Sequence, residues 1–409
     1  MDAKKIMQIF EDTAFVRTGG SPEELRCAEY LRGVLAEMGL EAQLEEFEVP
    51  MATMEQAELI VDGESIPCKG YLCAGSWEVE APLYYLRGED PWSLSQCKDK
   101  IVLVDGSVGH WLYKDLRENG ALGYITYDGA LNLADRDIDQ KEQRELVHQG
   151  NRMPAVNLNA KDAFRLIKSG AKTAKIILKQ EEYTGKSHNI VLDLPGEIDE
   201  FIVLSAHYDS TSLSRGSYDN MSGSVGLLGL AEYFAKVPHR YGLRFVWCGS
   251  EERGLLGAKA YTAAHEEELK KAALNINLDM IGSVMGKFFA CCTCEEKLSH
   301  YLSYMAAERG LGIALMMDAY SSDSTPFADK GVPAMTFARL APQNIATIHN
   351  RYDTAEVLSA GQMLEDIDFI AAFTQRMAQA RRCPVDRKIP DKMKEKIDIY
   401  LCRKRAPKL

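Results

Sequence analysis

Apolar strand-like runs alternate with helical patterns from about residue 187 onward, and this alternation is the feature that most constrains the fold. Each apolar run ends in a polar cluster, and a helix follows. The expected elements, in chain order, are strand 201–206, helix 222–235, strand 243–248, helix 253–264, strands 273–278 and 333–337, and helix 359–382. Such a pattern is typical of a mostly parallel or mixed central sheet flanked by helices. The sequence therefore predicts an α/β fold whose ligands bind beyond the carboxyl ends of its strands.

The remaining sequence falls into two further regions. Near the N-terminus, Ser21, Pro22 and Glu24 form the start of an amphipathic helix, which ends at Gly39. Between residues 50 and 182 the chain has short strand and helix patterns of its own, and few residues there are suited to chemistry. We therefore predict a discontinuous domain of residues 1–49 and 183–382, a smaller inserted α/β domain of residues 50–182, and a basic C-terminal tail of residues 383–409.

Charge and composition exclude several classes of function. The 409 residues include 48 basic and 60 acidic ones, a net charge of −12, which argues against a nucleic-acid surface. No apolar run approaches the ~20 residues of a membrane span. Residues 1–5 contain no apolar signal core, and ten cysteines are too few for a disulfide scaffold, so we expect a cytoplasmic protein with reduced thiols. The basic tail is expected to pack on the acidic body or on another subunit.

Ionisable side chains follow each of the expected strands and point to a metal site. They are, in chain order, His207, Asp209, Asp219, Glu251, Glu252, Asp279 and His349. Carboxylates that share one site repel each other, so we expect a cation among them. Imidazole with carboxylate and without thiolate suits zinc, with cobalt or manganese as alternatives. Two ions about 3.5–4 Å apart, bridged by one carboxylate, account for the number of ligands.

Five motifs in this order resemble the co-catalytic dinuclear zinc aminopeptidases of the M28 peptidase type. The motifs are His207-Tyr208-Asp209, Asp219-Asn220-Met221-Ser222-Gly223, Gly249-Ser250-Glu251-Glu252 with Gly254-Leu255-Leu256-Gly257, Leu278-Asp279-Met280, and His349 with Asp353-Thr354. The resemblance covers residues 187–382 and implies a zinc-exopeptidase-like fold. The inserted region resembles the protease-associated domain that many members of this family carry.

The resemblance implies a ligand set for two zinc ions per chain. His207 and Asp279 would bind one ion, Glu252 and His349 would bind the other, and Asp219 would bridge both. The resemblance further implies an exopeptidase that removes N-terminal residues from peptides. Peptides are the expected partners, nucleic acid and membrane are not, and self-association into a homo-oligomer stays open.

Two neighbouring acids complete the implied site. Asp209 would orient His207 from behind, as metal-bound histidines require. Glu251 would be the general base that takes a proton from the attacking water. Adjacent residues that leave a strand point in different directions, so the neighbour of the metal ligand Glu252 is free for this role.

The sequence departs from the family pattern at two positions, and two other functions remain as alternatives. Ile348 stands where many members have Tyr, and Ser324 where many have His, so the substrate pocket is expected to differ. A di-zinc carboxypeptidase like the glutamate carboxypeptidases would need an arginine for the terminal carboxylate, with Arg215, Arg253 and Arg339 as candidates. A catalytically inactive binding protein of the same fold is the second alternative.

Overall fold

The structure is a computed structural model that describes residues 1–407, so the last two residues of the basic tail, 408 and 409, lie outside the described part. Tertiary contacts divide the chain into two compact units. The main unit comprises residues 1–49 and 186–409, and the inserted unit comprises residues 50–185. Two long strands, β1 (Gln43–Val61) and β8 (Thr173–Leu194), contribute residues to both units.

The main unit is built on a mixed sheet. In sheet order its strands are β13 (Ala314–Met317), β12 (Lys287–Thr293), β14 (Ala334–Leu340), β11 (Ala272–Leu278), β9 (Ile198–His207), β10 (Tyr241–Cys248) and β8. The four strands β14, β11, β9 and β10 run parallel. Strand β12 is antiparallel to β14 and parallel to β13, and β8 is antiparallel to β10. The predicted α/β fold with a mostly parallel or mixed sheet is confirmed. The carboxyl ends of the four parallel strands lie on one edge.

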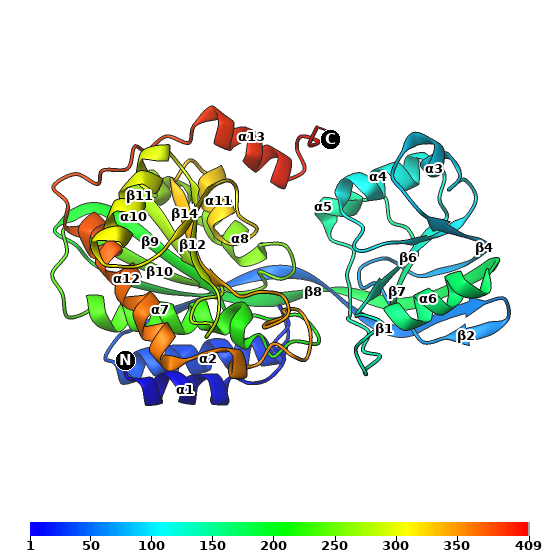
Figure 1. Ribbon diagram of the computed structural model, residues 1–409, viewed down its shortest axis with the longest axis horizontal. Coiled ribbons are helices and arrows are strands. Elements are labelled where there is room, and N and C mark those ends of the chain that lie inside the picture. Colours follow the sequence, from blue (N-terminus) through cyan, green and yellow to red (C-terminus); the bar gives the residue numbers. More distant parts are fainter. Residues whose placement is uncertain (408–409) are drawn as a thin grey trace. The chain divides into compact units, whose positions relative to one another are not determined.

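Helices cover this sheet in two groups (Figure 1). The first group comprises α1 (Ala3–Asp12), α2 (Pro22–Glu37), α7 (Ser222–Phe234), α10 (Glu296–Glu308) and α12 (Ala360–Gln379). Their apolar side chains share one large core with the central strands. The second group comprises α8 (Leu256–Ala264), α9 (Glu266–Leu269), α11 (Ser324–Asp329) and α13 (Asp391–Tyr400). In the described part of the chain, no helix combines the length and the apolar character that crossing a membrane would require.

The expected start of one helix was wrong. The sequence pattern predicts a helix from residue 253, whereas α8 begins at Leu256. The preceding residues, Gly254 and Leu255, have φ angles of 106° and 62°, which are left-handed and incompatible with an α-helix. The turn they form returns the chain to the strand end, since the N–H of Leu256 donates to the carbonyl of Ser250.

The inserted unit has its own sheet and core. Its elements are β2 (Glu64–Ile66), β3 (Lys69–Gly70), β4 (Trp77–Leu86), α3 (Pro91–Ser95), β5 (Ile101–Val104), α4 (His110–Glu118), β6 (Gly123–Asp128), α5 (Glu145–His148), β7 (Ala155–Asn159) and α6 (Ala160–Ser169). Strands β4, β5, β6 and β7 are parallel, and a separate apolar cluster fills the space beneath the helices. A second α/β body thus interrupts the main unit in sequence.

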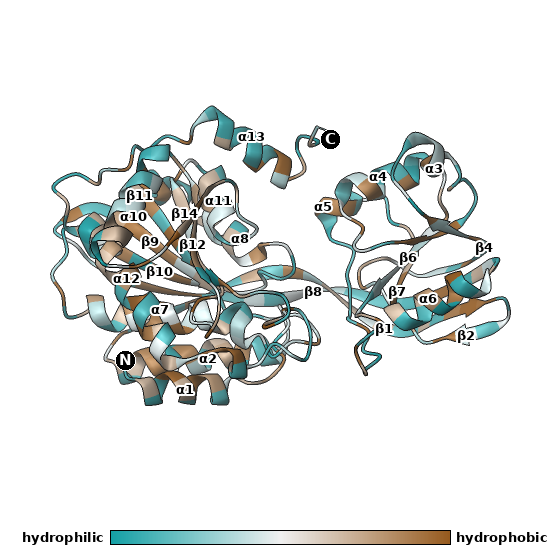
Figure 2. Ribbon diagram, viewed as in Figure 1, coloured by the Kyte–Doolittle hydropathy of each residue, from teal (hydrophilic) through white to brown (hydrophobic). Residues whose placement is uncertain are grey.

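The basic tail contains a helix, α13, that packs on the main unit. Helix α13 buries Met393 and Ile397 in a small apolar cluster with Ala328 of α11. Figure 2 shows that α13 carries both hydrophobic and hydrophilic residues. Arg403 adds an ion pair with Asp329 at 2.6 Å. The tail therefore packs on the body of its own chain.

Arg17 is a fully buried cation that fastens the N-terminal segment to the loop after β9. Its guanidinium donates to five backbone carbonyls, those of Thr13, Phe15, Tyr208, Arg215 and Gly216. Arg17→Met should lower the free energy of unfolding by roughly 3 kcal/mol or more, because each buried acceptor left unpaired costs ~1–3 kcal/mol. Urea denaturation followed by circular dichroism measures the loss. Arg32→Met, at an exposed side chain, is the control, and equal midpoints for the two variants would contradict this role.

Candidate metal centre

The candidate site residues lie at the carboxyl edge of the main sheet. His207 is the last residue of β9, Glu251 and Glu252 follow β10, and Asp279 follows β11 directly. Asp219 lies in a short turn of π-helix, η1 (Ser217–Met221), that precedes α7. A further residue, His349, comes from the loop after β14. Segments separated by up to 142 positions are thus brought to one place by the parallel strand order.

Five of these side chains form two donor sets that share one carboxylate. His207, Asp219 and Asp279 make one set, Asp219, Glu252 and His349 make the other, and within each set the ligand atoms lie within 4.8 Å of one another. Asp219 Oδ1 is 3.3 Å from His207 Nε2, whereas its Oδ2 is 3.1 Å from His349 Nε2. Each oxygen of Asp219 therefore faces a different imidazole, which is the arrangement that a bridging carboxylate requires.

Asp209 supports both sides of the site. It is fully buried, and its Oδ1 lies 3.4 Å from Nδ1 of His207, the ring nitrogen that points away from the donor set. The same carboxylate accepts hydrogen bonds from the backbone N–H groups of Glu251 at 2.9 Å and Glu252 at 3.2 Å. Asp209 thus positions the turn after β10 as well as the imidazole, a second role that the sequence did not predict.

The charges at this edge are unbalanced without a cation. Burial raises the pKa of Asp279 to about 7, against the lowering effect of His207. Burial likewise raises the pKa of Glu251 well above its usual range, and the neighbouring acids add to that effect. Asp279 Oδ1 is buried and has no hydrogen-bond partner among the described residues. A buried carboxylate oxygen without a donor, 3.9 Å from His207 Nε2, fits a metal ligand.

Asp353 holds the turn that carries Asp219. Its carboxylate accepts hydrogen bonds from the backbone N–H of Tyr218 at 2.7 Å and of Asp219 at 3.2 Å, and from the hydroxyl of Ser214 at 3.1 Å. Burial, with the nearby charge of Asp219, raises the pKa of Asp353 to about 7. The peptide bond between Asp219 and Asn220 is cis. Asp353 belongs to the sequence motif around His349, but nothing in the sequence assigned it this contact.

Glu24 is a supporting residue that the sequence pointed to only as a helix start. It is almost fully buried, and its Oε1 accepts hydrogen bonds from the backbone N–H of Ser250 at 2.7 Å and from the hydroxyl of Ser187 at 2.9 Å. Its other oxygen accepts from the N–H of Gly20 at 2.6 Å. Burial and the charge of Asp209 raise the pKa of Glu24 to about 8. The first turn of α2 thereby anchors the loop that carries Glu251.

Two glycines of the motifs allow helices to approach the strand ends closely. A Cβ atom on Gly223, in the first turn of α7, would collide with the carbonyl oxygen of Leu278. A Cβ atom on Gly257, in the first turn of α8, would collide with the carbonyl oxygen of Gly249. These contacts place the helix beginnings next to the site, and any other residue would push them away.

At the two positions that depart from the family pattern, Ile348 and Ser324, the side chains point to packing roles and supply neither a phenol nor an imidazole. Ile348 packs against the edge of the main core. Ser324 is fully buried, and its hydroxyl makes a hydrogen bond of 2.8 Å with that of Thr336. Both side chains therefore serve packing within the protein.

A mixed sheet that presents two imidazole-carboxylate donor sets at its carboxyl edge has the fold and the ligand types of a metallopeptidase. Residues 189–374 match the sequence profile described as Peptidase family M28. The predicted resemblance to peptidase family M28 is therefore confirmed over these residues.

The similar proteins include bacterial and fungal aminopeptidases. Aminopeptidase YwaD of Bacillus subtilis (strain 168) is 27% identical over 410 residues, which cover 94% of this chain and 86% of that protein. Leucine aminopeptidase 2 of Trichophyton rubrum is 31% identical over 196 residues, 45% of this chain and 37% of that protein. The solved structure of BSAP, a zinc aminopeptidase from Bacillus subtilis, shares the fold with a TM-score of 0.77 and 23% identity, covering 95% of this chain and 99% of that one.

Proposed function

We propose that this chain is a dinuclear zinc aminopeptidase that hydrolyses N-terminal residues from peptides. The observation that carries the proposal is the shared carboxylate of Asp219, whose two oxygens face His207 and His349 in separate donor sets. His207, Asp219 and Asp279 would hold one ion, and Asp219, Glu252 and His349 the other. Zinc is the metal we expect, with cobalt or manganese as substitutes.

The residues of the chain have distinct tasks in this proposal. A pair of divalent ions supplies acidity to a water molecule and polarises a carbonyl group. Glu251, which belongs to neither donor set, accepts the proton of the attacking water and delivers it to the departing amine. It is buried, and its Oε2 lies 3.9 Å from His207 Nε2, so it borders the donor atoms. Asp209 keeps the Glu251 backbone and the His207 ring in place.

Substrate access and charge favour a peptide N-terminus. The His349 side chain is 48% exposed, so the second donor set opens to solvent, whereas the first set is buried. The carboxylates of the site, Glu251 among them, would attract the free α-amine of a peptide. The relatives named as aminopeptidases are consistent with this preference. Cleavage at chain ends follows from the recognition of that amine.

The carboxypeptidase alternative loses one of its arginine candidates. Arg339 is buried and pairs with the fully buried Asp366 at 2.6 Å, so its guanidinium is already neutralised within the fold. Arg253 donates to the carbonyl of Gly19 at 3.3 Å, and Arg215 is exposed. Arg339 is therefore excluded as the partner of a substrate carboxylate, and Arg215 and Arg253 are the candidates left to this alternative.

A pair of chromogenic substrates tests the proposed specificity. Leucine p-nitroanilide has a free amine and no terminal carboxylate, and a peptide substrate with an acetylated amine and a free carboxylate reverses these features. We expect hydrolysis of the first substrate and a kcat/KM at least ~100-fold lower for the second, since burying an unpaired charge or losing a paired one costs several kcal/mol. Preference for the acetylated substrate would support the carboxypeptidase, and hydrolysis of neither would support the inactive binding protein.

Tyr320 is the phenol that we expect to replace the family's Tyr at position 348. It lies between β13 and α11, and its ring packs on Phe289 with the centroids 6.0 Å apart. Burial and then the charges of Asp279 and Asp219 raise its pKa far above neutrality, so the hydroxyl stays protonated and can donate to a substrate oxygen.

Tyr320→Phe should therefore lower kcat by about 10²-fold with little change in KM, the effect of removing one donor to a developing oxyanion. Steady-state kinetics with leucine p-nitroanilide measures both constants. Tyr304→Phe, at a side chain that is 79% exposed, provides the matched control. A Tyr320→Phe enzyme with the kcat of the control would contradict the assignment.

Two further predictions and one open question remain. The inserted region of residues 50–182 is a protease-associated-like domain, the protein acts in the cytoplasm, and self-association stays open. Leader-peptide analysis and subcellular fractionation in the source cell address the second, and analytical ultracentrifugation addresses the third.

A further inference from the structure

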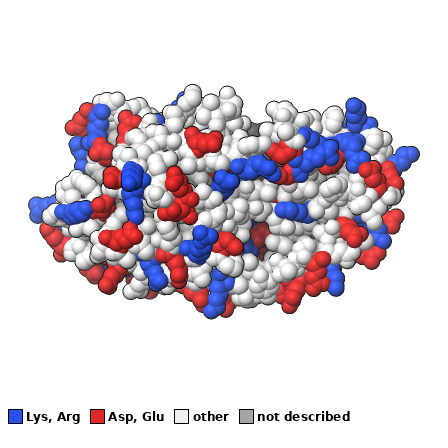
Figure 3. Space-filling model, turned by 90° about the horizontal axis from the view of Figure 1, so that it is seen from below, with Lys and Arg blue, Asp and Glu red and all other residues white. Residues whose placement is uncertain are grey.

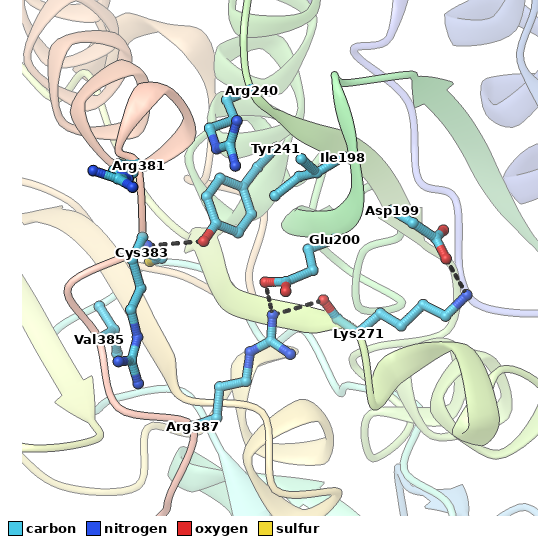
Figure 4. Close-up of a pocket in the computed structure, with 11 residues that line it drawn as sticks. Ile198, Asp199, Glu200, Arg240, Tyr241, Lys271, Arg381, Cys383, Val385 and Arg387 are labelled. Atoms are coloured by element: carbon cyan, nitrogen blue, oxygen red, sulfur yellow. Dashed lines mark hydrogen bonds and ion pairs between the residues drawn. The ribbon is translucent and has the colours of Figure 1, made fainter.

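A cavity lies in the main unit at the edge of the sheet opposite the candidate metal centre, where the parallel strands begin. It has a volume of about 770 Å³. Its lining comes from the start of β9, the start of β10, the residue before β11 and the segment after α12: Ile198, Asp199, Glu200, Arg240, Tyr241, Lys271, Arg381, Arg382, Cys383, Val385 and Arg387 (Figure 4). Because β9 is ten residues long, at ~3.3 Å per residue this cavity is roughly 30 Å from the candidate metal centre.

The charge of this cavity is opposite to that of the protein. Five of its lining residues are basic, namely Arg240, Lys271, Arg381, Arg382 and Arg387, and two are acidic, which leaves a surplus of three positive charges. The whole chain has a net charge of −12. A concave site of one sign with low-dielectric walls concentrates ions of the other sign. The cavity therefore favours an anion.

Part of this positive charge has no carboxylate partner. The two acids of the cavity are already engaged, since Lys271 pairs with Asp199 at 2.6 Å and Arg387 pairs with Glu200. Arg381 and Arg382 form no ion pair within 4.0 Å among the described residues. Asp386, the acid nearest in sequence, pairs with Lys297 at 3.5 Å. The charge of Arg382 also helps to lower the pKa of Asp386, so of the two arginines Arg381 is the less compensated.

Arg240 adds a third incompletely paired guanidinium. Its Nη1 lies 3.7 Å from Glu197, while its Nε is buried and has no hydrogen-bond partner among the described residues. A buried N–H without an acceptor is rare in folded proteins. Arg240 therefore carries charge that the fold pairs only in part.

Several basic side chains outside the cavity are paired with acids. Lys175 pairs with Glu78 at 2.7 Å, and Lys179 pairs with Glu55 at 2.8 Å. On the face of the molecule that Figure 3 shows, Lys and Arg lie among Asp and Glu over much of the surface, and a row of Lys and Arg crosses the right half of the view. The surplus at the cavity is opposite in sign to the net charge of the chain, −12.

The basic segment of residues 381–387 is held in place by backbone contacts. The N–H of Cys383 donates to the hydroxyl of Tyr241 at 2.9 Å, and the N–H of Arg240 donates to the carbonyl of Ala378 at 3.0 Å. Arg387 also donates to the carbonyl of Lys271 at 3.2 Å. These bonds, visible in part in Figure 4, hold the backbone of this segment beside the sheet, while the side chains of Arg381 and Arg382 are exposed.

We propose that this cavity binds a small phosphorylated molecule, with Arg240, Arg381 and Arg382 as its phosphate-binding residues. Guanidinium groups match phosphate oxygens with paired hydrogen bonds. The side chains of Ile198 and Val385 and the ring of Tyr241 provide apolar lining for the organic part of such a ligand. The volume lies within the ~300–1,000 Å³ of small-molecule sites.

Isothermal titration calorimetry of the full chain tests this site, with AMP as the phosphorylated probe and adenosine as the same molecule without phosphate. We expect AMP to bind with a Kd below ~1 mM and adenosine to bind at least tenfold more weakly, since charge-assisted hydrogen bonds carry the affinity. Arg381→Gln/Arg382→Gln should weaken AMP binding by about tenfold or more. Both side chains are exposed, so this variant should fold, as circular dichroism would verify.

The matched control is Lys392→Gln/Lys394→Gln, which removes the same charge from exposed positions of α13 outside the cavity. It should keep the Kd for AMP within about twofold, because screened charges outside the site contribute little. Equal losses in both variants would show unspecific attraction and overturn the proposal. AMP binding that survives Arg381→Gln/Arg382→Gln would place the anion elsewhere, for instance at the metal centre, and would also overturn it. Neither outcome bears on the proposed peptidase activity.

Discussion

Glu251→Gln should lower kcat on leucine p-nitroanilide by about 10²- to 10⁴-fold, the range expected when a general base is lost. The amide has the size of the carboxylate but cannot accept the proton of the attacking water. Glu251 belongs to neither donor set, so the variant should still bind two ions per chain. Stopped-flow or steady-state kinetics gives kcat, and inductively coupled plasma mass spectrometry gives the metal content.

The neighbouring residue provides the contrast. Glu252→Gln changes an acid that lies 3.2 Å from His349 Nε2 within the second donor set, so metal content should fall there while it stays constant in Glu251→Gln. If Glu251→Gln kept more than about a tenth of the original kcat, the rate loss would be too small for a general base, and the assignment would be wrong.

Asp219→Asn has the second large expected effect, on metal binding itself. Burial raises the pKa of Asp219, but hydrogen bonds from His207 and His349 outweigh burial and lower the pKa below its usual range, so the carboxylate is charged and available to both donor sets. The substitution removes that charge and replaces one of the two oxygens. Changing even an outer partner of a metal ligand costs ~10–100-fold in affinity, so we expect a loss of at least about 100-fold and fewer than two ions per chain.

Asp353→Asn tests the same turn without touching a proposed ligand atom. Asp353 accepts from the backbone N–H groups of Tyr218 and Asp219, and the amide retains one acceptor oxygen. We expect a metal affinity between those of the original protein and Asp219→Asn. Retention of two tightly bound ions by Asp219→Asn would show that its carboxylate is not shared.

The order of the central elements could be predicted because apolar runs mark buried strands. His207 and Asp279 each follow such a run, and parallel neighbours must end on the same edge, so their proximity follows from the pattern alone. The start of α8 could not be predicted, since the left-handed conformation of Leu255 is unusual for a residue with a side chain. The grouping of the ligands into two sets came from the resemblance to the M28 family. The structure brings the same residues together in two sets that share Asp219.

The supporting contacts were beyond sequence reasoning because they join distant segments without a local pattern. In the sequence, Glu24 has the position of an ordinary helix-capping acid. In the structure, it accepts a hydrogen bond from the backbone N–H of Ser250, 226 positions later. Asp209 likewise fixes the backbone of Glu251 across 42 positions. In both cases, tertiary packing decides which acid is buried, and a single sequence does not encode that choice as a periodic signal. The same holds for the cavity around Arg381, whose charges are far apart along the chain.

Metal content measured together with chelator sensitivity tests the central claim most directly. The purified protein, dialysed into metal-free buffer, should contain about two transition-metal ions per chain, because the two donor sets share Asp219. Treatment with 1,10-phenanthroline should abolish hydrolysis of leucine p-nitroanilide, and added zinc should restore it. A metal-free protein that cleaves this substrate at the same rate with and without chelator would contradict the dinuclear centre.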